Sequence, residues 1–279
     1  NYHPHDLLHP TQDTEFIEFY NAGASQVDLS GWVISDGVVF TFSPATFLDP
    51  ASYLVIAVNP TALQAATGHA GALQWTSGAL SNGGERVAIR DSFGNLMDEV
   101  EYSDGGAWPS QPDGSGPSLE LINPNLPNQY AASWRASSGI NGTPGAQNSV
   151  FNAAPAPIII SPMHTPSIPA PSTPVTVTAL VLDDGMSPPN VTLNYRQDAV
   201  SPGAYLQTPM LDDGAHGDGA AGDDTYGATL TGLANGEQYD FYITADDGSA
   251  VSTFPRNHPT ANGSCSAVGC QADQNPTCV

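Results

Sequence analysis

Two short runs in the first half of the chain alternate between apolar and polar residues. Val87 and Ile89 alternate with arginine and alanine in the first run, and Val100 and Tyr102 alternate with glutamate in the second. A period of two predicts β-strands that each turn one face toward a core. Residues 91–95, between the runs, are mostly turn-forming types. The pattern therefore predicts a β-hairpin with a loop of four or five residues.

The same alternation predicts which side chains of this region are buried. Val87 is expected in the core, together with Trp32 from an earlier strand. Arg86 and Glu101 fall on the opposite face and are expected to be exposed. Nothing in the hairpin is chemically reactive, which favours a structural or binding module.

Further short apolar runs recur about every ten residues, with glycine, proline or aspartate between them. Strands at this spacing are typical of an antiparallel β-sandwich. A single short helix is expected over residues 61–68. The strands of the first half are predicted at residues 15–20, 27–34, 38–42, 53–58 and 118–122.

A second alternating region begins at Val175 and predicts another β-sandwich. Tyr239, Phe241 and Ile243 are expected to share one face of its most aromatic strand. The fold class predicted for the whole chain is therefore all-β, with two antiparallel β-sandwiches. The strands of this second region are predicted at residues 175–182, 191–196, 228–230 and 238–244.

Proline and alanine separate the two regions. Residues 149–173 carry repeated proline, a composition typical of a stiff, extended linker. The predicted domain order is a β-sandwich with its N-terminal segment over 1–148, this linker, a second sandwich over 174–256, and a cysteine-containing tail over 257–279.

The charge balance excludes several functions. Aspartate and glutamate number 28 against five arginines and no lysine, which gives a net charge of −23. Such a chain repels phosphate and has no electrostatic footprint for nucleic acid. Lysine-based covalent chemistry is excluded outright. No run of 18 apolar residues predicts a membrane span. An acidic surface of this kind suits an extracellular or cell-surface protein.

A glycine-rich stretch of the second region concentrates carboxylates. Oxygen ligands on a mobile backbone suit Ca²⁺, although the spacing is not that of an EF-hand. The alternative is that aspartate and glycine form turns by bonding their own backbone. Asp-Asp-Gly at 183–185 and at 246–248 repeats the same turn chemistry. The candidate ligands are Asp212, Asp213, Asp218, Asp223 and Asp224.

All three cysteines lie in the last fifteen residues. Cys265 and Cys270 are spaced to close a small disulfide loop. Cys278 is then left over for a second chain or for missing residues. Zinc is the alternative, with His258 as the only nearby imidazole.

The sequence contains none of the common catalytic motifs. There is no Gly-x-Ser-x-Gly, no His-Glu-x-x-His, no phosphate loop and no dinucleotide fingerprint. Glu99 and Glu101 lie on one exposed strand face, which is typical of a solvated surface rather than of a glycosidase pair. The chain is therefore predicted not to be an enzyme.

Residues 15–148 resemble the lamin tail domain as it occurs in exported bacterial proteins. Nine short segments match in order: residues 15–21, 28–32, 53–56, 80–85, 98–102, 108–109, 113–121, 133–134 and 142–145. The resemblance implies an immunoglobulin-like sandwich that acts in protein contacts and is not an enzyme. The chain lacks the coiled-coil rod of a lamin, so a nuclear role is not implied. The second region resembles fibronectin-type or immunoglobulin-like domains of exported bacterial proteins.

These observations favour a non-catalytic, exported structural protein that works through protein contacts, such as a subunit of a cell-surface or extracellular filament or matrix. Self-assembly through residues 1–14 or 257–279 is expected. The alternative is an accessory fragment of a secreted multidomain hydrolase. Carbohydrate binding is a further hypothesis, because four tryptophans could stack against sugar rings: Trp32, Trp75, Trp108 and Trp134.

Overall fold

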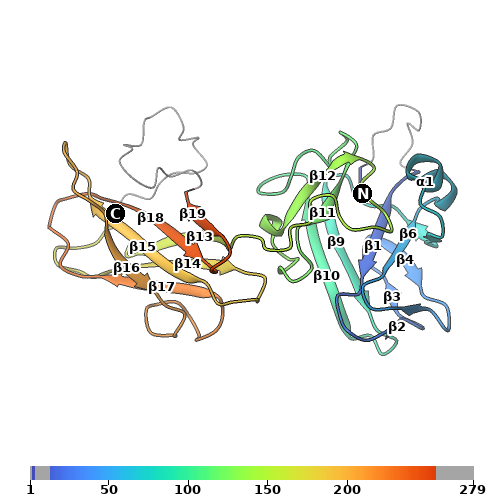
Figure 1. Ribbon diagram of the computed structural model, residues 1–279, viewed down its shortest axis with the longest axis horizontal. Coiled ribbons are helices and arrows are strands. Elements are labelled where there is room, and N and C mark those ends of the chain that lie inside the picture. Colours follow the sequence, from blue (N-terminus) through green and yellow to red (C-terminus); the bar gives the residue numbers. More distant parts are fainter. Residues whose placement is uncertain (1, 4–12, 256–279) are drawn as a thin grey trace. The chain divides into compact units, whose positions relative to one another are not determined.

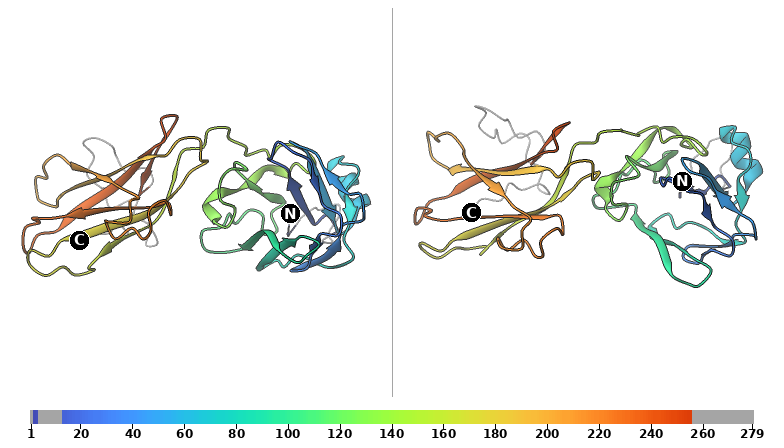
Figure 2. Two further views of the ribbon diagram at one scale, coloured as in Figure 1. Left: turned by 90° about the horizontal axis from the view of Figure 1, so that it is seen from below. Right: turned by 60° about the horizontal axis from the view of Figure 1, so that its bottom comes forward.

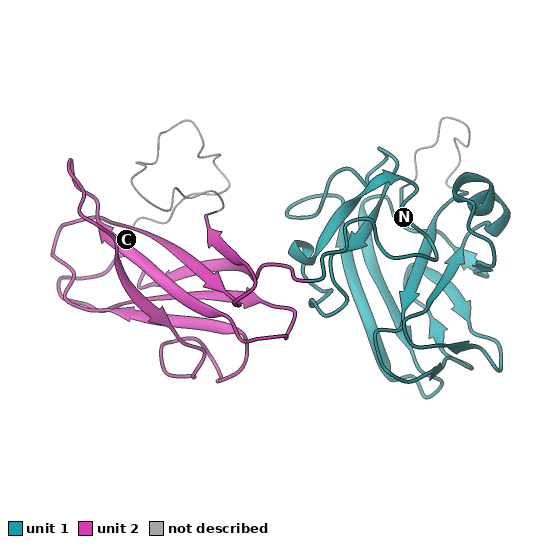
Figure 3. Cartoon of the chain, in the orientation of Figure 1, with its two compact units in different colours: residues 1–153 teal, residues 154–279 magenta. Residues whose placement is uncertain are grey.

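The computed structural model describes residues 2–3 and 13–255 (Figure 1). The chain divides into two compact units, residues 1–153 and residues 154–279 (Figure 3). Each unit is built from mainly antiparallel sheets with short connections, and the prediction of an all-β, immunoglobulin-like sandwich fold is confirmed.

The described part of unit 1 contains four sheets, because turns interrupt its strands often. The largest has the strand order β10-β9-β3-β4-β8, and a second has the order β1-β6-β7, with β6 and β7 parallel. Two strand pairs, β2-β5 and β11-β12, complete the unit. The strands are β1 (Phe16–Tyr20), β2 (Val27–Asp28), β3 (Val33–Ile34), β4 (Val38–Thr41), β5 (Phe47–Leu48), β6 (Tyr53–Ala57), β7 (Leu73–Gln74), β8 (Ser77–Gly78), β9 (Gly84–Arg90), β10 (Leu96–Ser103), β11 (Pro117–Leu121) and β12 (Trp134–Ile140).

The predicted hairpin is present as β9 and β10. Val87 pairs with Val100 and Arg86 with Glu101, which fixes the predicted facing of the two strands. Gly84 opens β9 with a φ of 103°, and a Cβ there would lie 2.4 Å from the carbonyl oxygen of Tyr102. Only glycine allows both this backbone angle and this close approach.

The core of unit 1 agrees with the prediction for Val87 and differs for Trp32. Val87 is buried. Trp32 is only half-buried at the margin of the core, and Trp75 is the buried tryptophan instead. Arg86 is half-buried rather than exposed, because its guanidinium is held between Asp36 and Glu99.

The run 27–34 forms two strands rather than the single predicted strand. Gly31 has a φ of 74°, so the backbone turns between β2 and β3. The two halves then join different sheets. Apolar and polar residues alternate from Val27 to Ser30, and three apolar residues follow Gly31, so the glycine and the loss of alternation mark the break.

The expected helix is present as α1 (Pro60–Thr67). The side chain of Asn59 accepts hydrogen bonds from the backbone N–H groups of Thr61 and Ala62, and Pro60 occupies the first turn. Gly68 ends the helix in a left-handed conformation. A 3-10 turn, η1 (Ala131–Ser133), is the other helical element among the described residues. None of the described helices is long and apolar enough to cross a membrane.

Unit 2 is a sandwich of two sheets, which Figure 2 shows as separate layers. The strand orders are β13-β14-β17 and β16-β15-β18-β19. Its core lies between the sheets and includes Phe241 and Ile243, while Tyr239 is half-buried. The strands are β13 (Ile158–Thr165), β14 (Val175–Leu182), β15 (Asn190–Gln197), β16 (Leu206–Met210), β17 (Thr225–Leu230), β18 (Tyr239–Asp246) and β19 (Val251–Phe254).

The predicted linker over 149–173 is too long. Residues 158–165 form β13, which pairs along its length with β14. Ile158 and Ile159 are buried, so this segment belongs to the sandwich despite the prolines around it. Three predictions concern residues outside the described part of the chain: the disulfide between Cys265 and Cys270, the leftover Cys278, and zinc binding by His258.

Candidate functional site

The acidic loop, residues 211–224, connects β16 to β17 at one end of unit 2. Its two flanking strands belong to different sheets, and a bridge between Leu211 and Gly227 holds them together at the base of the loop. The loop therefore crosses from one layer of the sandwich to the other. All five predicted metal ligands lie on it.

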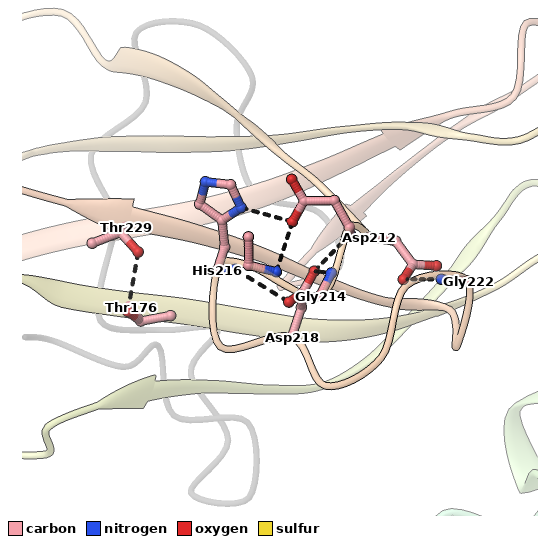
Figure 4. Close-up of polar contacts among 9 residues, drawn as sticks. Thr176, Asp212, Gly214, His216, Asp218, Gly222 and Thr229 are labelled. Carbon is pink, nitrogen blue, oxygen red and sulfur yellow. Dashed lines mark hydrogen bonds and ion pairs between the residues drawn. The ribbon is translucent and has the colours of Figure 1, made fainter.

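Asp218 is the centre of the loop. It is 1% exposed, and its two carboxylate oxygens accept three backbone N–H groups (Figure 4). Oδ2 accepts from Asp213 and Gly214 at 2.9 and 3.1 Å, and Oδ1 accepts from His216 at 3.2 Å. Burial opposes ionisation, but these N–H donors outweigh it and lower the pKa of Asp218. An ionised carboxylate thus organises the first half of the loop.

Asp212 and Asp223 organise the second half in the same way. Asp212 accepts from the backbone N–H groups of Gly222 at 2.7 Å and Asp224 at 3.0 Å. Asp223 accepts from Ala220 and from Thr225 at 2.9 and 3.0 Å, and these bonds lower its pKa.

Asp213 and Asp224 differ from the other three. Asp213 accepts from the His216 ring at 3.0 Å, and this side-chain bond lowers the pKa of Asp213. Asp224 has a φ of 65° and contributes its carbonyl oxygen to Val181 of β14. Burial, with Asp212 and Asp223 close by, raises the pKa of the Asp224 carboxyl.

This arrangement uses the carboxylates as acceptors for the loop's own backbone. In the residues that the structure describes, no group of three or more His, Cys, Asp or Glu side chains is placed to hold a metal ion. The structure therefore brings the five aspartates into one loop but not around one point. Calcium binding by this loop stays a prediction.

Three loops place aspartates at the same end of unit 2. Asp183 and Asp184 follow β14, Asp246 and Asp247 end β18 and begin the turn to β19, and the acidic loop follows β16. Pairing of Asn190 with Asp246 and of Val181 with Asp224 brings the loops together. The repeated Asp-Asp-Gly turns are visible in the sequence. The meeting of the three loops at one end of unit 2 depends on the order of the strands in the sheets, which the local sequence pattern does not reveal.

Replacing Asp218 with alanine is expected to lower the stability of unit 2 by about 2 kcal/mol. Three backbone N–H groups would lose a charged, buried acceptor. Thermal unfolding, followed by circular dichroism, measures the change. The exposed Asp198→Ala in the same unit is the control, and an equal melting temperature for the two variants would show that the loop does not depend on Asp218.

Unit 1 contains a second organised carboxylate. Glu120 on β11 is 4% exposed and accepts from the hydroxyls of Thr143 and Ser149 at 2.9 and 2.7 Å. Glu18 on β1 accepts from the backbone N–H of Gly145. These bonds attach residues 143–150 to two strands, and they indicate a structural role for both carboxylates.

Glu15 directly precedes β1. In the described part of unit 1 it is the carboxyl whose hydrogen bonding is least complete. It is 0% exposed; Oε2 accepts from the backbone N–H of Leu80 at 2.9 Å, whereas Oε1 is buried without a partner. Burial raises the pKa of Glu15 to about 7, and nearby Glu85 adds to the shift.

The remaining candidate residues are dispersed. Trp108 and Trp134 are half-buried, with ring centroids 6.2 Å apart, and the indole N–H of Trp134 donates to the carbonyl of Asn128. Trp75 is buried, and its indole N–H donates to Gly78. His3 contacts Asp113 at 2.6 Å, and His5 and His9 lie outside the described residues.

The fold places both units among the immunoglobulin-like β-sandwiches. Residues 6–104 match the family model of the Lamin Tail Domain, which is an immunoglobulin-like, non-enzymatic interaction fold. The match ends just after β10 and covers the N-terminal part of unit 1. No curated protein matches the chain.

Proposed function

We propose that this chain is a non-catalytic, exported structural protein that acts through protein contacts, as a subunit of an extracellular or cell-surface assembly. The observation that carries the proposal is the match of residues 6–104 to an interaction domain. Both sandwiches use their buried carboxylates to hold backbone and loops in place. The acidic, lysine-free composition supports a location outside the cell.

Self-assembly is the specific form of contact that we propose. Sandwich proteins can associate in a head-to-tail manner, which gives filaments when the rotation does not close. The N-terminal segment 1–14 and the tail 257–279 are the proposed contact regions. The net charge of −23 makes copies of the chain repel one another, which opposes random association. Added salt screens this repulsion and should therefore favour the specific contact. Calcium held by the acidic loop would act in the same direction.

Sedimentation velocity of the full chain tests this function. We expect a species larger than the monomer whose population rises with salt or Ca²⁺, and we expect deletion of residues 257–279 to give monomers with unchanged circular dichroism. A variant with Cys265, Cys270 and Cys278 replaced by serine separates disulfide cross-linking from non-covalent docking. A monomer at every salt and Ca²⁺ concentration would contradict self-assembly and favour the alternative of an accessory fragment of a secreted hydrolase.

A further inference from the structure

Strand β10 ends the largest sheet of unit 1. Within the part of the chain that the structure describes, it pairs with β9 and with no strand on its other side. In unit 2 the edge strands β16 and β17 contact each other across the two sheets, as do β13 and β19. Within the described residues no strand covers the outer edge of β10, although Asn128 bonds Asp98 at one end of the edge and the Tyr2 ring packs against the Tyr102 ring. Unpaired N–H and C=O groups on an edge are a template for another strand.

The two faces of β10 differ in chemistry. Val100 and Tyr102 point toward the core, where Tyr102 is buried and Val100 is half-buried. Glu99 and Glu101 occupy the opposite face. A strand added beside β10 would therefore place alternate side chains next to apolar residues and next to carboxylates.

The carboxylates of this edge exceed its cations. Arg86 and Arg90 are the cations on the same face of β9, and Arg86 already pairs with Glu99 and Asp36. No ion pair among the described residues includes Asp98, Glu101 or Asp104. A second copy of this chain would bring the same carboxylates to the edge, so like charges oppose that occupant.

Apolar side chains extend the edge toward the tip of the hairpin. Phe93 is 90% exposed, and Leu96 and Met97 are about half exposed. The register shifts at Met97, so regular pairing is available from Asp98 onward. The side-chain amide of Asn128 donates a hydrogen bond to Oδ1 of Asp98 at 2.8 Å. Asp98 is the first residue of the regularly paired part of β10.

We propose that the outer edge of β10, residues 98–103, binds an extended segment of a different, basic protein as an added strand. The segment alternates apolar residues, which face Val100 and Tyr102, with lysine or arginine, which face Glu99 and Glu101. Main-chain hydrogen bonds hold the segment, and charge selects it. This inference rests on the proposed function as an interaction protein and specifies one partner chemistry.

The test uses the full chain and a short synthetic peptide in which lysine alternates with valine. Calorimetry is expected to detect binding that weakens as salt rises, and hydrogen exchange is expected to slow at the amides of β10. The same peptide with N-methylated backbone amides should not bind. Glu101→Lys should weaken binding about tenfold or more, and Glu101→Gln should weaken it less.

Glu237→Lys is the matched control, because Glu237 is an exposed carboxylate of unit 2 and its substitution changes the net charge equally. We expect this control to bind as the unchanged chain does, with melting temperatures confirming that every variant is folded. Equal weakening by Glu101→Lys and Glu237→Lys, binding of the N-methylated peptide, or no binding at all would overturn the proposal. Each result is separate from sedimentation of the chain alone, so failure here does not decide self-assembly.

Discussion

Glu15→Gln is expected to remove much of the pH dependence of the stability of unit 1. In the unchanged protein, the free energy of unfolding should fall as pH rises from about 4.5 to about 7, by about 1.4 kcal/mol per pH unit from this one group. The total is about 3 kcal/mol. The variant should be more stable than the unchanged protein above neutral pH.

The sign follows from where the proton binds. The pKa of Glu15 is raised from its ordinary value of 4.5 to about 7, because the folded state buries the carboxyl. Below the ordinary value, folded and unfolded chains are both protonated and no stability is lost. Between the two values the unfolded chain ionises while the folded chain retains the proton, so stability falls, and it levels off above about pH 7.

Urea unfolding between pH 4 and 8 measures this effect, and Glu101→Gln on exposed β10 is the control. The variant is expected to keep a smaller slope, since burial also raises the pKa of half-buried Glu18 to about 7. Parallel pH profiles for Glu15→Gln and the unchanged protein would show that Glu15 is not the titrating group.

Val87→Asp is expected to unfold unit 1 or to destabilise it by about 4 kcal/mol. Val87 lies in the core between the sheets and is 8% exposed. Among the described residues that core consists of apolar and aromatic side chains, so the introduced carboxylate would be buried without a cationic partner. For a unit of this size, the melting temperature should fall by roughly 10 °C or more.

Val39→Asp is the matched control, because Val39 lies on β4 of the same sheet with a side chain that is 45% exposed. The same chemical change should cost about 0.5 kcal/mol or less there. Similar melting temperatures for the two variants would contradict the facing of β9.

Local alternation was sufficient to predict the β9–β10 hairpin and most of the long strands, but β12, β13 and β16 were missed. Strands of two residues, such as β7 and β8, carry too few positions for a period to be visible. Strand β13 was missed for a different reason. Its neighbouring prolines suggested a linker, and only pairing with β14 across the sandwich makes the segment a strand. Tertiary pairing of this kind is not encoded in local composition.

The candidate site shows the same division between composition and arrangement. The five aspartates of the acidic loop were identifiable by type and spacing, and both metal binding and turn formation were consistent with them. The direction of each carboxylate depends on which N–H groups the glycines expose. At Gly219, for instance, a Cβ would lie 2.5 Å from Oδ2 of Asp223. Such contacts are fixed only when the loop closes between β16 and β17.

The bonds of Glu120 set a practical limit on how this protein can be divided for experiments. The matched region ends at residue 104, but Leu119 and Trp108 pack against the same core as β9, and residues 143–150 are tied to β11 through Glu120. A fragment cut at residue 104 would lack both β11 and β12 and would expose that core. Recombinant versions of unit 1 therefore need to extend through residue 150.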